Sequence, residues 1–460
     1  MERFTLAQAA EWTKGEARGE AALTAVTTDS RQIPPEALFL PIKGERFDAH
    51  DFIGKAIENG AAAVMSHRES EEYPVPALYV ENTSQALLDL AGGYRAMCGG
   101  KVVGVTGSVG KTTTKELLYA VLSQGFRAQK TEGNLNNEIG LPLTLMRMTK
   151  DTEVLVAEMG MNHFGELSRM TAAAKPDLAV ITNIGTSHIE FLGSREGICK
   201  AKLEILEGLQ EGGAAVLCGD EPLLWDKRGS LGCKVVTYGI ENSTCDLIAH
   251  LHSDGTFDIV NNGLAAAQLP VGEAFTAKLS IPGKHNVINA LAAAAVGLLL
   301  GETPELIAQG LVSYQASGMR QNIYEQDGYH IYADCYNASP DAMEATLAVL
   351  GGMAKDARRF AVLGSMLELG DYAEEGHRRA GRAAAQYADA LYAYGPDAAA
   401  MVAGAREKGM ENAYAFDDQT ALVAALRADA KKGDALLFKG SRGMRMERAL
   451  AMFLGEEVEE

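Results

Sequence analysis

The chain has 460 residues, which corresponds to about three domains at roughly 150 residues each. Hydrophobic residues make up 47% of the sequence and charged residues 22%, a composition typical of an ordered globular protein. The 42 basic and 61 acidic residues give a formal net charge of −19, which argues against a nucleic-acid-binding protein, since such a protein needs a broad basic surface.

Neither a membrane span nor an export signal is predicted. The N-terminal residues MERFTLAQAAEW lack an apolar stretch of signal-peptide length, and the most apolar segment, 290–300, is too short to cross a bilayer. The six cysteines are scattered without a Cys-x-x-Cys pair, so we expect reduced thiols and no zinc cluster or disulfide framework. We therefore expect a cytoplasmic protein, and a monomer because no feature of the sequence points to an interface.

Residues 1–83 predict a small α/β domain. The runs ALFLPI (37–42) and ALYV (77–80) are typical of strands, and 51–59 is typical of a helix. A further helix, 82–97, is expected to lead into the next domain.

Residues 84–314 predict a central domain built on a doubly wound, mostly parallel sheet. Strand-like runs alternate with helical segments, and ligands bind at the carboxyl ends of the strands in such sheets. The expected strands are 102–107, 154–160, 178–185, 214–219 and 234–239. The expected helices are 115–123, 201–209 and 286–300. Segment 246–271 predicts short antiparallel strands in a side sheet.

Residues 315–460 predict a C-terminal Rossmann-like α/β domain. The expected strands are 330–336, 359–364, 388–395, 412–416 and 434–440. The expected helices include 341–350 and 375–387. The acidic end of the chain, 456–460, is expected to fray.

A glycine-rich loop, GVTGSVGKTTT (104–114), follows a predicted strand and opens a predicted helix. This is the context of a phosphate-binding P-loop, in which glycines allow several backbone N–H groups to point at one phosphate. Lys111 would supply a cation for the phosphates and Thr112 a hydroxyl for Mg²⁺. The alternative is a glycine-rich turn with a chance Lys-Thr pair, which the coincidence of strand, glycines, Lys and Thr disfavours.

Two further side chains fall near the same edge of the predicted sheet. Glu158 ends one strand and His188 closely follows another, and a carboxylate is a ligand that Mg²⁺ prefers. Lys200 and Lys202 follow at an expected helix start. Taken singly, each has an alternative interpretation. For Glu158 it is a surface charge at a strand end, for His188 a hydrogen-bonded core residue, and for the two lysines a solvated helix face.

Taken together, these motifs resemble the Mur ligase family of peptidoglycan synthesis over essentially the whole chain. They are GxTGxxGKTT from Gly104, EMG (158–160), TNIGxxH (182–188), KAKxEI (200–205) and GKHNxxNALAA (283–293). Four more segments favour a member that adds D-Ala-D-Ala, and no Asp-Asn-Pro-Arg segment of the diaminopimelate-adding member occurs. The four segments that favour this member are EGNLNNEIGLP (132–142), DCYNASPDAM (334–343), LGSMLELG (363–370) and FKGSRGMxME (438–447).

The resemblance implies an ATP-dependent ligase that joins D-Ala-D-Ala to a UDP-N-acetylmuramoyl-tripeptide through an acyl phosphate. It implies two Mg²⁺ sites, with Thr112 and Glu158 at the first and His188 at the second. Lys202 matches a lysine that carries a carbamate in several family members, and Lys111, Lys202, His188 and Arg320 are the implied catalytic residues. The implied ATP-binding residues are Gly107, Ser108, Val109, Gly110, Lys111, Thr112, Thr113, Asn289, Arg320 and Asp334.

The residues that would contact the UDP-linked substrate and the dipeptide are indicated by less specific sequence patterns. The expected UDP-substrate contacts are Ser30, Arg31, Lys43, Asn134, Asn136 and Asn137. The expected dipeptide contacts are Asn337, Lys439, Ser441 and Arg442. Rival interpretations are another amino-acid-adding or folylpolyglutamate synthase-like ligase, a P-loop NTPase switch, and an inactive nucleotide-sugar-binding protein.

Overall fold

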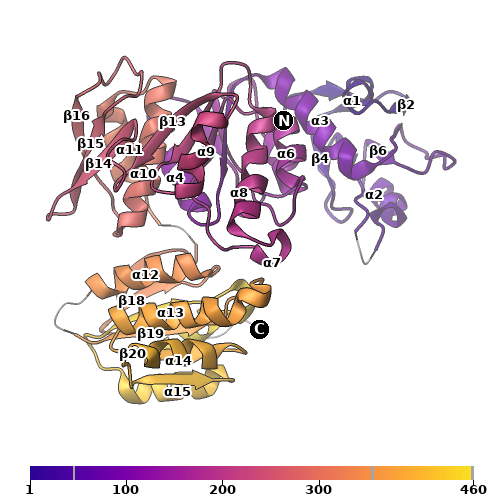
Figure 1. Cartoon of the computed structure of the whole chain (residues 1–460). Coiled ribbons are helices and arrows are strands. Elements are labelled where there is room, and N and C mark those ends of the chain that lie inside the picture. Colours follow the sequence, from indigo (N-terminus) through magenta and orange to yellow (C-terminus); the bar gives the residue numbers. More distant parts are fainter. Residues whose placement is uncertain (45–46, 317, 354–356, 457–460) are drawn as a thin grey trace.

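Three main sheets organise the chain, and each lies within one of the three predicted segments (Figure 1). The computed structural model describes residues 1–44, 47–316, 318–353 and 357–456, so most of the acidic end expected to fray lies outside the described residues. The predicted α/β class with mostly parallel sheets is confirmed. Among the described residues, no helix is both long enough and apolar enough to cross a bilayer.

The N-terminal sheet has five strands in the order β2-β7-β6-β5-β4, parallel except for β2 at one edge. Its strands are β2 (Glu16–Arg18), β4 (Ala25–Thr27), β5 (Ala37–Phe39), β6 (Ala63–Ser66) and β7 (Ala77–Tyr79). A separate antiparallel pair joins β1 (Phe4–Thr5) and β3 (Ala22–Leu23). The helices are α1 (Leu6–Thr13), the short 3₁₀ turn η1 (Ala49–Phe52), α2 (Ile53–Glu58) and α3 (Thr83–Cys98). Asn82 caps α3, as its side-chain oxygen accepts from the Ser84 and Gln85 N–H groups.

The central sheet has nine strands in the order β16-β15-β14-β13-β12-β11-β8-β10-β9. Its parallel strands are β8 (Lys101–Thr106), β9 (Ala128–Lys130), β10 (Val154–Glu158), β11 (Leu178–Ile181), β12 (Ala214–Cys218), β13 (Lys234–Gly239) and β14 (Leu247–Leu251). Two antiparallel strands complete one edge, β15 (Thr256–Asn261) and β16 (Ala274–Lys278). The predicted antiparallel strands in 246–271 are confirmed by the pairing of β14 with β15, but the prediction of a separate side sheet was wrong, because β14 also pairs with β13 and so extends the main sheet.

Helices pack against this sheet, and the first of them, α4, follows the glycine-rich loop directly. They are α4 (Lys111–Leu122), α5 (Gly140–Leu145), α6 (Glu166–Ala174), α7 (Ile189–Leu192), α8 (Arg195–Leu203), η2 (Glu204–Gly208), α9 (Pro222–Lys227), η3 (Arg228–Ser230), α10 (Lys284–Leu300) and α11 (Pro304–Ser313). The predicted helix at 201–209 was wrong in its boundaries. Ser194 caps α8 by accepting from the Gly197 N–H, so Lys200 and Lys202 lie in its last turn and not at a helix start.

The C-terminal sheet has six strands in the order β17-β18-β22-β19-β20-β21. They are β17 (Asn322–Gln326), antiparallel to its neighbour, and β18 (Tyr329–Asp334), β19 (Arg359–Gly364), β20 (Ala390–Tyr394), β21 (Ala413–Phe416) and β22 (Ala435–Lys439), all parallel. The helices are α12 (Pro340–Gly352), η4 (Gly370–Tyr372), α13 (Ala373–Tyr387), α14 (Ala398–Glu407), α15 (Gln419–Asp429), η5 (Arg442–Met444) and α16 (Met446–Leu454).

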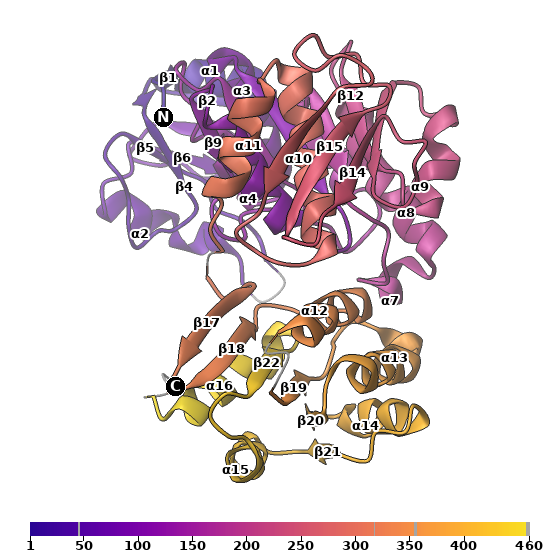
Figure 2. The same cartoon turned by 90° about the vertical axis from the view of Figure 1, so that its left-hand side faces the viewer.

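The carboxyl ends of the central strands face the C-terminal domain. Strand β8 pairs with β10 on one side and β11 on the other, so the loops after all three strands meet at one edge of the sheet. In Figures 1 and 2 the C-terminal domain lies below this edge, with α7 and α12 at the boundary. The two domains therefore enclose the place where ligands of a doubly wound sheet bind.

Close packing of α13 against α14 generates a prediction for the C-terminal domain. A Cβ at Gly381 would lie 1.9 Å from the carbonyl oxygen of Met401, so Gly381→Ala forces the helices apart. We expect it to lower the free energy of unfolding by about 1–3 kcal/mol, measured by urea denaturation followed by circular dichroism. The control is Gly352→Ala, whose Cβ meets nothing within 4 Å. Equal stability of the two variants would contradict the packing described here.

Candidate active site

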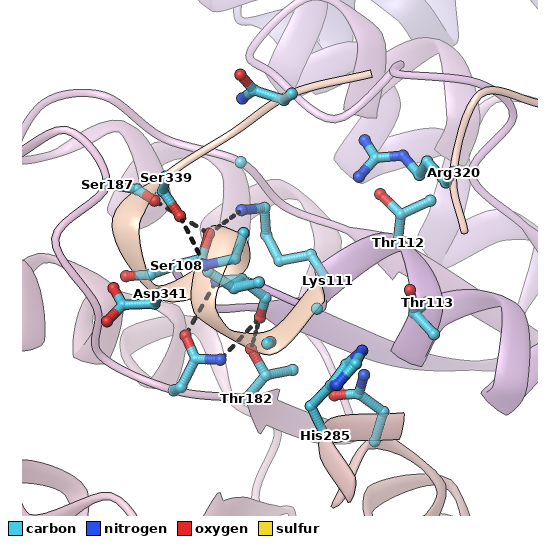
Figure 3. A pocket seen from close by; sticks show the side chains of 18 of the residues that line it. Ser108, Lys111, Thr112, Thr113, Thr182, Ser187, His285, Arg320, Ser339 and Asp341 are labelled. Atoms are coloured by element: carbon cyan, nitrogen blue, oxygen red, sulfur yellow. Dashed lines mark hydrogen bonds between the residues drawn. The ribbon is translucent and has the colours of Figure 1, made fainter. Parts of the chain in front are cut away.

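A cavity of about 590 Å³ lies between the carboxyl edge of the central sheet and the C-terminal domain. Residues from both domains line it, which brings together positions more than 200 residues apart. The predicted site residues that line it are Ser108, Val109, Gly110, Lys111, Thr112, Thr113, Asn134, Asn136, Asn137, Glu158, His188, Asn289, Arg320, Asp334, Asn337 and Lys439. Figure 3 shows Arg320 and Thr112 on one side of the glycine-rich loop, and Asp341 and Ser187 on the other.

The loop between β8 and α4 has the backbone conformation that phosphate binding needs. Gly110 has φ +83° and Gly107 has φ +151°, and a Cβ at Gly107 would lie 1.8 Å from the Thr182 hydroxyl oxygen. Only glycine fits there, because the chain turns tightly against the neighbouring strand end. Lys111 Nζ donates to the Gly107 carbonyl at 2.7 Å, so the cation lies over the loop.

Asn183 clamps the tip of this loop from the next strand. Its side-chain oxygen accepts from the Val109 N–H at 2.9 Å and its amide group donates to the Val109 carbonyl at 3.0 Å. The Thr182 hydroxyl donates to the same carbonyl at 2.6 Å. Asn183 lies in the TNIG motif but is not among the predicted site residues.

Glu158 is buried at the end of β10, with 2% of its surface exposed. Its Oε1 accepts from the Thr112 hydroxyl at 3.2 Å and from the Asn136 amide at 2.9 Å, while Oε2 has no hydrogen-bond partner. Lys115 Nζ, also buried, lies 3.7 Å from Oε2. A hydroxyl beside a carboxylate whose second oxygen accepts no hydrogen bond is a donor set that fits Mg²⁺, so the residues present suit the metal that the sequence implies.

Three nitrogen bases near the loop have lowered pKa values. Burial, with Lys111 and Lys202 nearby, lowers the pKa of His188 to about 3, so its ring is neutral and keeps a lone pair. Burial and the charge of Lys111 hold the pKa of Lys202 well below its ordinary range. Burial and Arg320 lower the pKa of Lys111, whereas Glu158 opposes this shift. A neutral amine is the form of lysine that adds CO₂, which suits the carbamate expected at Lys202.

Asp334 at the end of β18 holds a small network in the C-terminal domain. It accepts from Lys439 Nζ, from the Gln321 N–H at 3.2 Å and from the Thr346 hydroxyl at 3.3 Å. Lys439 also donates to the Asn337 carbonyl at 3.0 Å and is 3% exposed. In this structure Lys439 therefore orients Asp334, and its pairing with a dipeptide carboxylate stays a prediction.

Family profiles match all three parts of the chain. The Mur ligase family catalytic domain matches residues 22–95, the Mur ligase middle domain 105–297, and the Mur ligase glutamate ligase domain 319–442. The chain belongs to the Mur ligase family. The middle-domain match includes Lys111, Glu158 and His188, so the matched region contributes to the lining of the cavity.

Several characterised Mur ligases are similar to this one over nearly its full length. A UDP-N-acetylmuramoyl-tripeptide–D-alanyl-D-alanine ligase from Bacillus subtilis is 41% identical, covering 92% of this chain and 91% of its own. A MurF crystal structure from Acinetobacter baumannii has a TM-score of 0.90 at 31% identity, covering 99% and 100% of the two chains. The MurF ligase from Thermotoga maritima in complex with ADP has a TM-score of 0.83 at 33% identity, covering 94% and 97%.

Seven predicted site residues of this Mur ligase do not line the cavity. Ser30, Arg31 and Lys43 lie in the N-terminal domain, where Arg31 pairs with Asp29 at 2.8 Å. Gly107 lies in the loop and packs against Thr182. The others are Lys202, which is buried, Ser441, which accepts from the Leu367 N–H, and Arg442, which pairs with Glu447. The roles predicted for these residues stay predictions.

The clamp on Val109 generates a test of the loop geometry. We expect Asn183→Leu to weaken ADP binding by about tenfold, because it leaves the partly buried Val109 N–H without a partner and the Val109 carbonyl with the Thr182 hydroxyl as its remaining donor. Isothermal titration with ADP measures the change. The control is Asn262→Leu, since Asn262 also donates to two carbonyls but lies outside the cavity. Unchanged ADP affinity in Asn183→Leu would show that the loop holds its shape without the clamp.

Proposed function

We propose that this Mur ligase joins D-Ala-D-Ala to a UDP-N-acetylmuramoyl-tripeptide, with ATP as the energy source. The observation that carries the proposal is one cavity that combines a P-loop, the Thr112–Glu158 pair and Arg320 from the C-terminal domain. The likeness to a ligase of this specificity at 41% identity supports the choice of substrates. The four sequence segments that favour a D-Ala-D-Ala-adding member agree with it.

In the first step, a terminal carboxylate oxygen of the tripeptide attacks the γ-phosphorus of ATP. A carbon–oxygen–phosphorus linkage forms, the bond to the β-phosphate oxygen breaks, and ADP leaves with the electron pair. Lys111 and Arg320 reduce the repulsion between carboxylate and triphosphate. Thr112 and Glu158 would hold one Mg²⁺, and His188 with a Lys202 carbamate a second, which would supply Lewis-acid neutralisation of the phosphate oxygens.

In the second step, the neutral amine of D-Ala-D-Ala attacks the acyl carbon. The tetrahedral intermediate loses one proton from the nitrogen to solvent and collapses, so that inorganic phosphate leaves with the bridging oxygen and the amide is formed. The acyl phosphate is sensitive to water, and a C-terminal domain closed over the cavity protects it. Asn337, Lys439, Ser441 and Arg442 on that domain are the proposed contacts of the dipeptide.

The UDP end of the substrate would reach from the cavity to the N-terminal domain. Asn136 lies at the inner end of this path, where its amide donates to Glu158. Asn134 and Asn137 line the cavity, and Ser30, Arg31 and Lys43 would contact the UDP group. A cytoplasmic location, where ATP and UDP-linked precursors are available, and a monomeric state stay predictions.

Phosphate release from ATP and Mg²⁺ tests the reaction. We expect release only when both the UDP-tripeptide and D-Ala-D-Ala are present, with a UDP-muramoyl-pentapeptide in the mass spectrum. Release with neither substrate would indicate an NTPase switch. Release only with another amino acid as acceptor would indicate a different ligase of the family.

Lys111 is the residue on which the P-loop assignment depends most. We expect Lys111→Ala to lower kcat by roughly 100-fold or more, because the transferring phosphoryl group loses a cation held in place. The control is Lys101→Ala, an exposed lysine at the start of β8. Steady-state rates of amide formation measure both variants, and wild-type activity in Lys111→Ala would remove the P-loop assignment.

The carbamate generates a separate prediction. We expect Lys202→Ala to lose activity and to regain part of it with formate or acetate, since a small carboxylate replaces the anionic oxygen. Lys111→Ala should not respond to these anions, because its missing group is a cation. An unmodified Lys202 amine in crystals grown with bicarbonate would speak against the carbamate.

A further inference from the structure

A carboxylate of the C-terminal domain reaches across the cavity to the loop that carries His188. Asp341 lies in the first turn of α12, after the cap Ser339 and Pro340. Its Oδ2 accepts from the Thr186 N–H at 3.0 Å and from the Thr186 hydroxyl at 3.3 Å. Thr186 is only 5% exposed, whereas the Asp341 side chain is 31% exposed at the cavity, so the contact is shielded from water on the Thr186 side.

Asp341 is also held from behind by its own domain. Arg379 of α13 lies 2.9 Å from its Oδ1 and also pairs with Glu344, one turn further along α12. The guanidinium thus fixes the carboxylate with one oxygen free to reach Thr186. The charge of Arg379 stays compensated by Glu344 when Asp341 is removed.

The central domain accommodates this carboxylate by having glycine beside Thr186. A Cβ at Gly185 would lie 2.3 Å from Asp341 Oδ2 and 3.2 Å from the Ser108 Cβ. Because Gly185 has no side chain, the Asp341 carboxylate of the C-terminal domain can approach the backbone of the central domain this closely. Figure 3 shows Asp341 next to Ser108 and Ser187 at this point.

The segment that Asp341 touches is the same one that shapes the P-loop. Asn183, three residues before Thr186, holds the Val109 peptide from both sides, and the Ser108 N–H donates to the Asn183 carbonyl at 3.2 Å. A shift of this segment would move the phosphate-binding loop and the C-terminal domain together.

We propose that Asp341 is a positioning residue, an interdomain catch that seats on Thr186 and Gly185 and aligns the incoming amine with the acyl phosphate. This inference rests on the proposed function and deepens it. Without the catch, the C-terminal domain samples orientations in which the amine is out of line and water reaches the acyl carbon. Water attack breaks the same acyl–oxygen bond, releases phosphate and regenerates the tripeptide carboxylate, so ATP is consumed without an amide.

The test is the ratio of phosphate released to pentapeptide formed. Wild-type enzyme should release one phosphate for each pentapeptide. In Asp341→Ala the ratio of phosphate to pentapeptide should rise by about tenfold above one. The matched control is Glu344→Ala, which removes the other carboxylate partner of Arg379 on the same helix but makes no contact with Thr186, and it should stay coupled. A merely structural defect would lower both products in proportion and leave the ratio unchanged.

Two more variants keep the inference falsifiable if Asp341→Ala folds poorly. Asp341→Asn keeps the shape of the side chain and removes its charge. Gly185→Ala adds a Cβ 2.3 Å from Asp341 Oδ2, so it blocks the same contact from the central domain. Both should be uncoupled as Asp341→Ala is. A ratio of one with wild-type kcat in Asp341→Asn and Gly185→Ala would overturn the catch.

Solution scattering tests the same contact without the reaction. With ADP bound, Asp341→Ala and Gly185→Ala should have a larger radius of gyration than the wild type and Glu344→Ala. Equal profiles in all four proteins would overturn the catch even if the ligase activity is correct. A wild type that forms no pentapeptide would instead refute the proposed function, and the scattering result would then decide the interdomain contact alone.

Discussion

Repulsion between anions is the constraint around which the site is built. The proposed reaction needs a carboxylate and a triphosphate within bonding distance, and the chain as a whole is itself acidic, with a formal net charge of −19. Positive charge therefore has to be concentrated locally, and it comes from both domains: Lys111 over the glycine-rich loop and Arg320 from the other side of the cavity. Backbone N–H groups at the start of α4 add partial charge that does not need a side chain.

Electrostatic repulsion, here between like positive charges, also explains why not every basic side chain of the site is positively charged. Packing Lys202 and His188 beside the Lys111 cation would be unfavourable if both were charged, and burial together with the charge of Lys111 lowers the pKa of each. Neutral His188 and Lys202 are then available for metal ligation and carbamate formation. Lys115 differs from them, because it is buried between Glu116 and Glu158, where its charge is matched by carboxylates.

Local patterns allowed the sequence to predict the parts of the site that depend on a single strand and its following loop. The P-loop, Glu158 and His188 follow the ends of β8, β10 and β11, and parallel pairing places them at one edge. Contacts between distant segments left no such pattern, so the pairing of Lys439 with Asp334 and the reach of Asp341 to Thr186 were not predicted. The predicted start of α8 was six residues too late, because the cap that begins the helix is Ser194.

Transfer of an oxygen atom from the tripeptide carboxylate to inorganic phosphate tests most directly whether an acyl phosphate forms. The tripeptide carboxylate is labelled with ¹⁸O in both positions, and the inorganic phosphate is analysed by mass spectrometry after a single turnover with D-Ala-D-Ala. Attack of the carboxylate on ATP followed by amide formation predicts one ¹⁸O in each phosphate, with the other retained in the new amide carbonyl. Phosphate without label would show that water or another nucleophile cleaves ATP, and would contradict the ligase mechanism derived from this cavity.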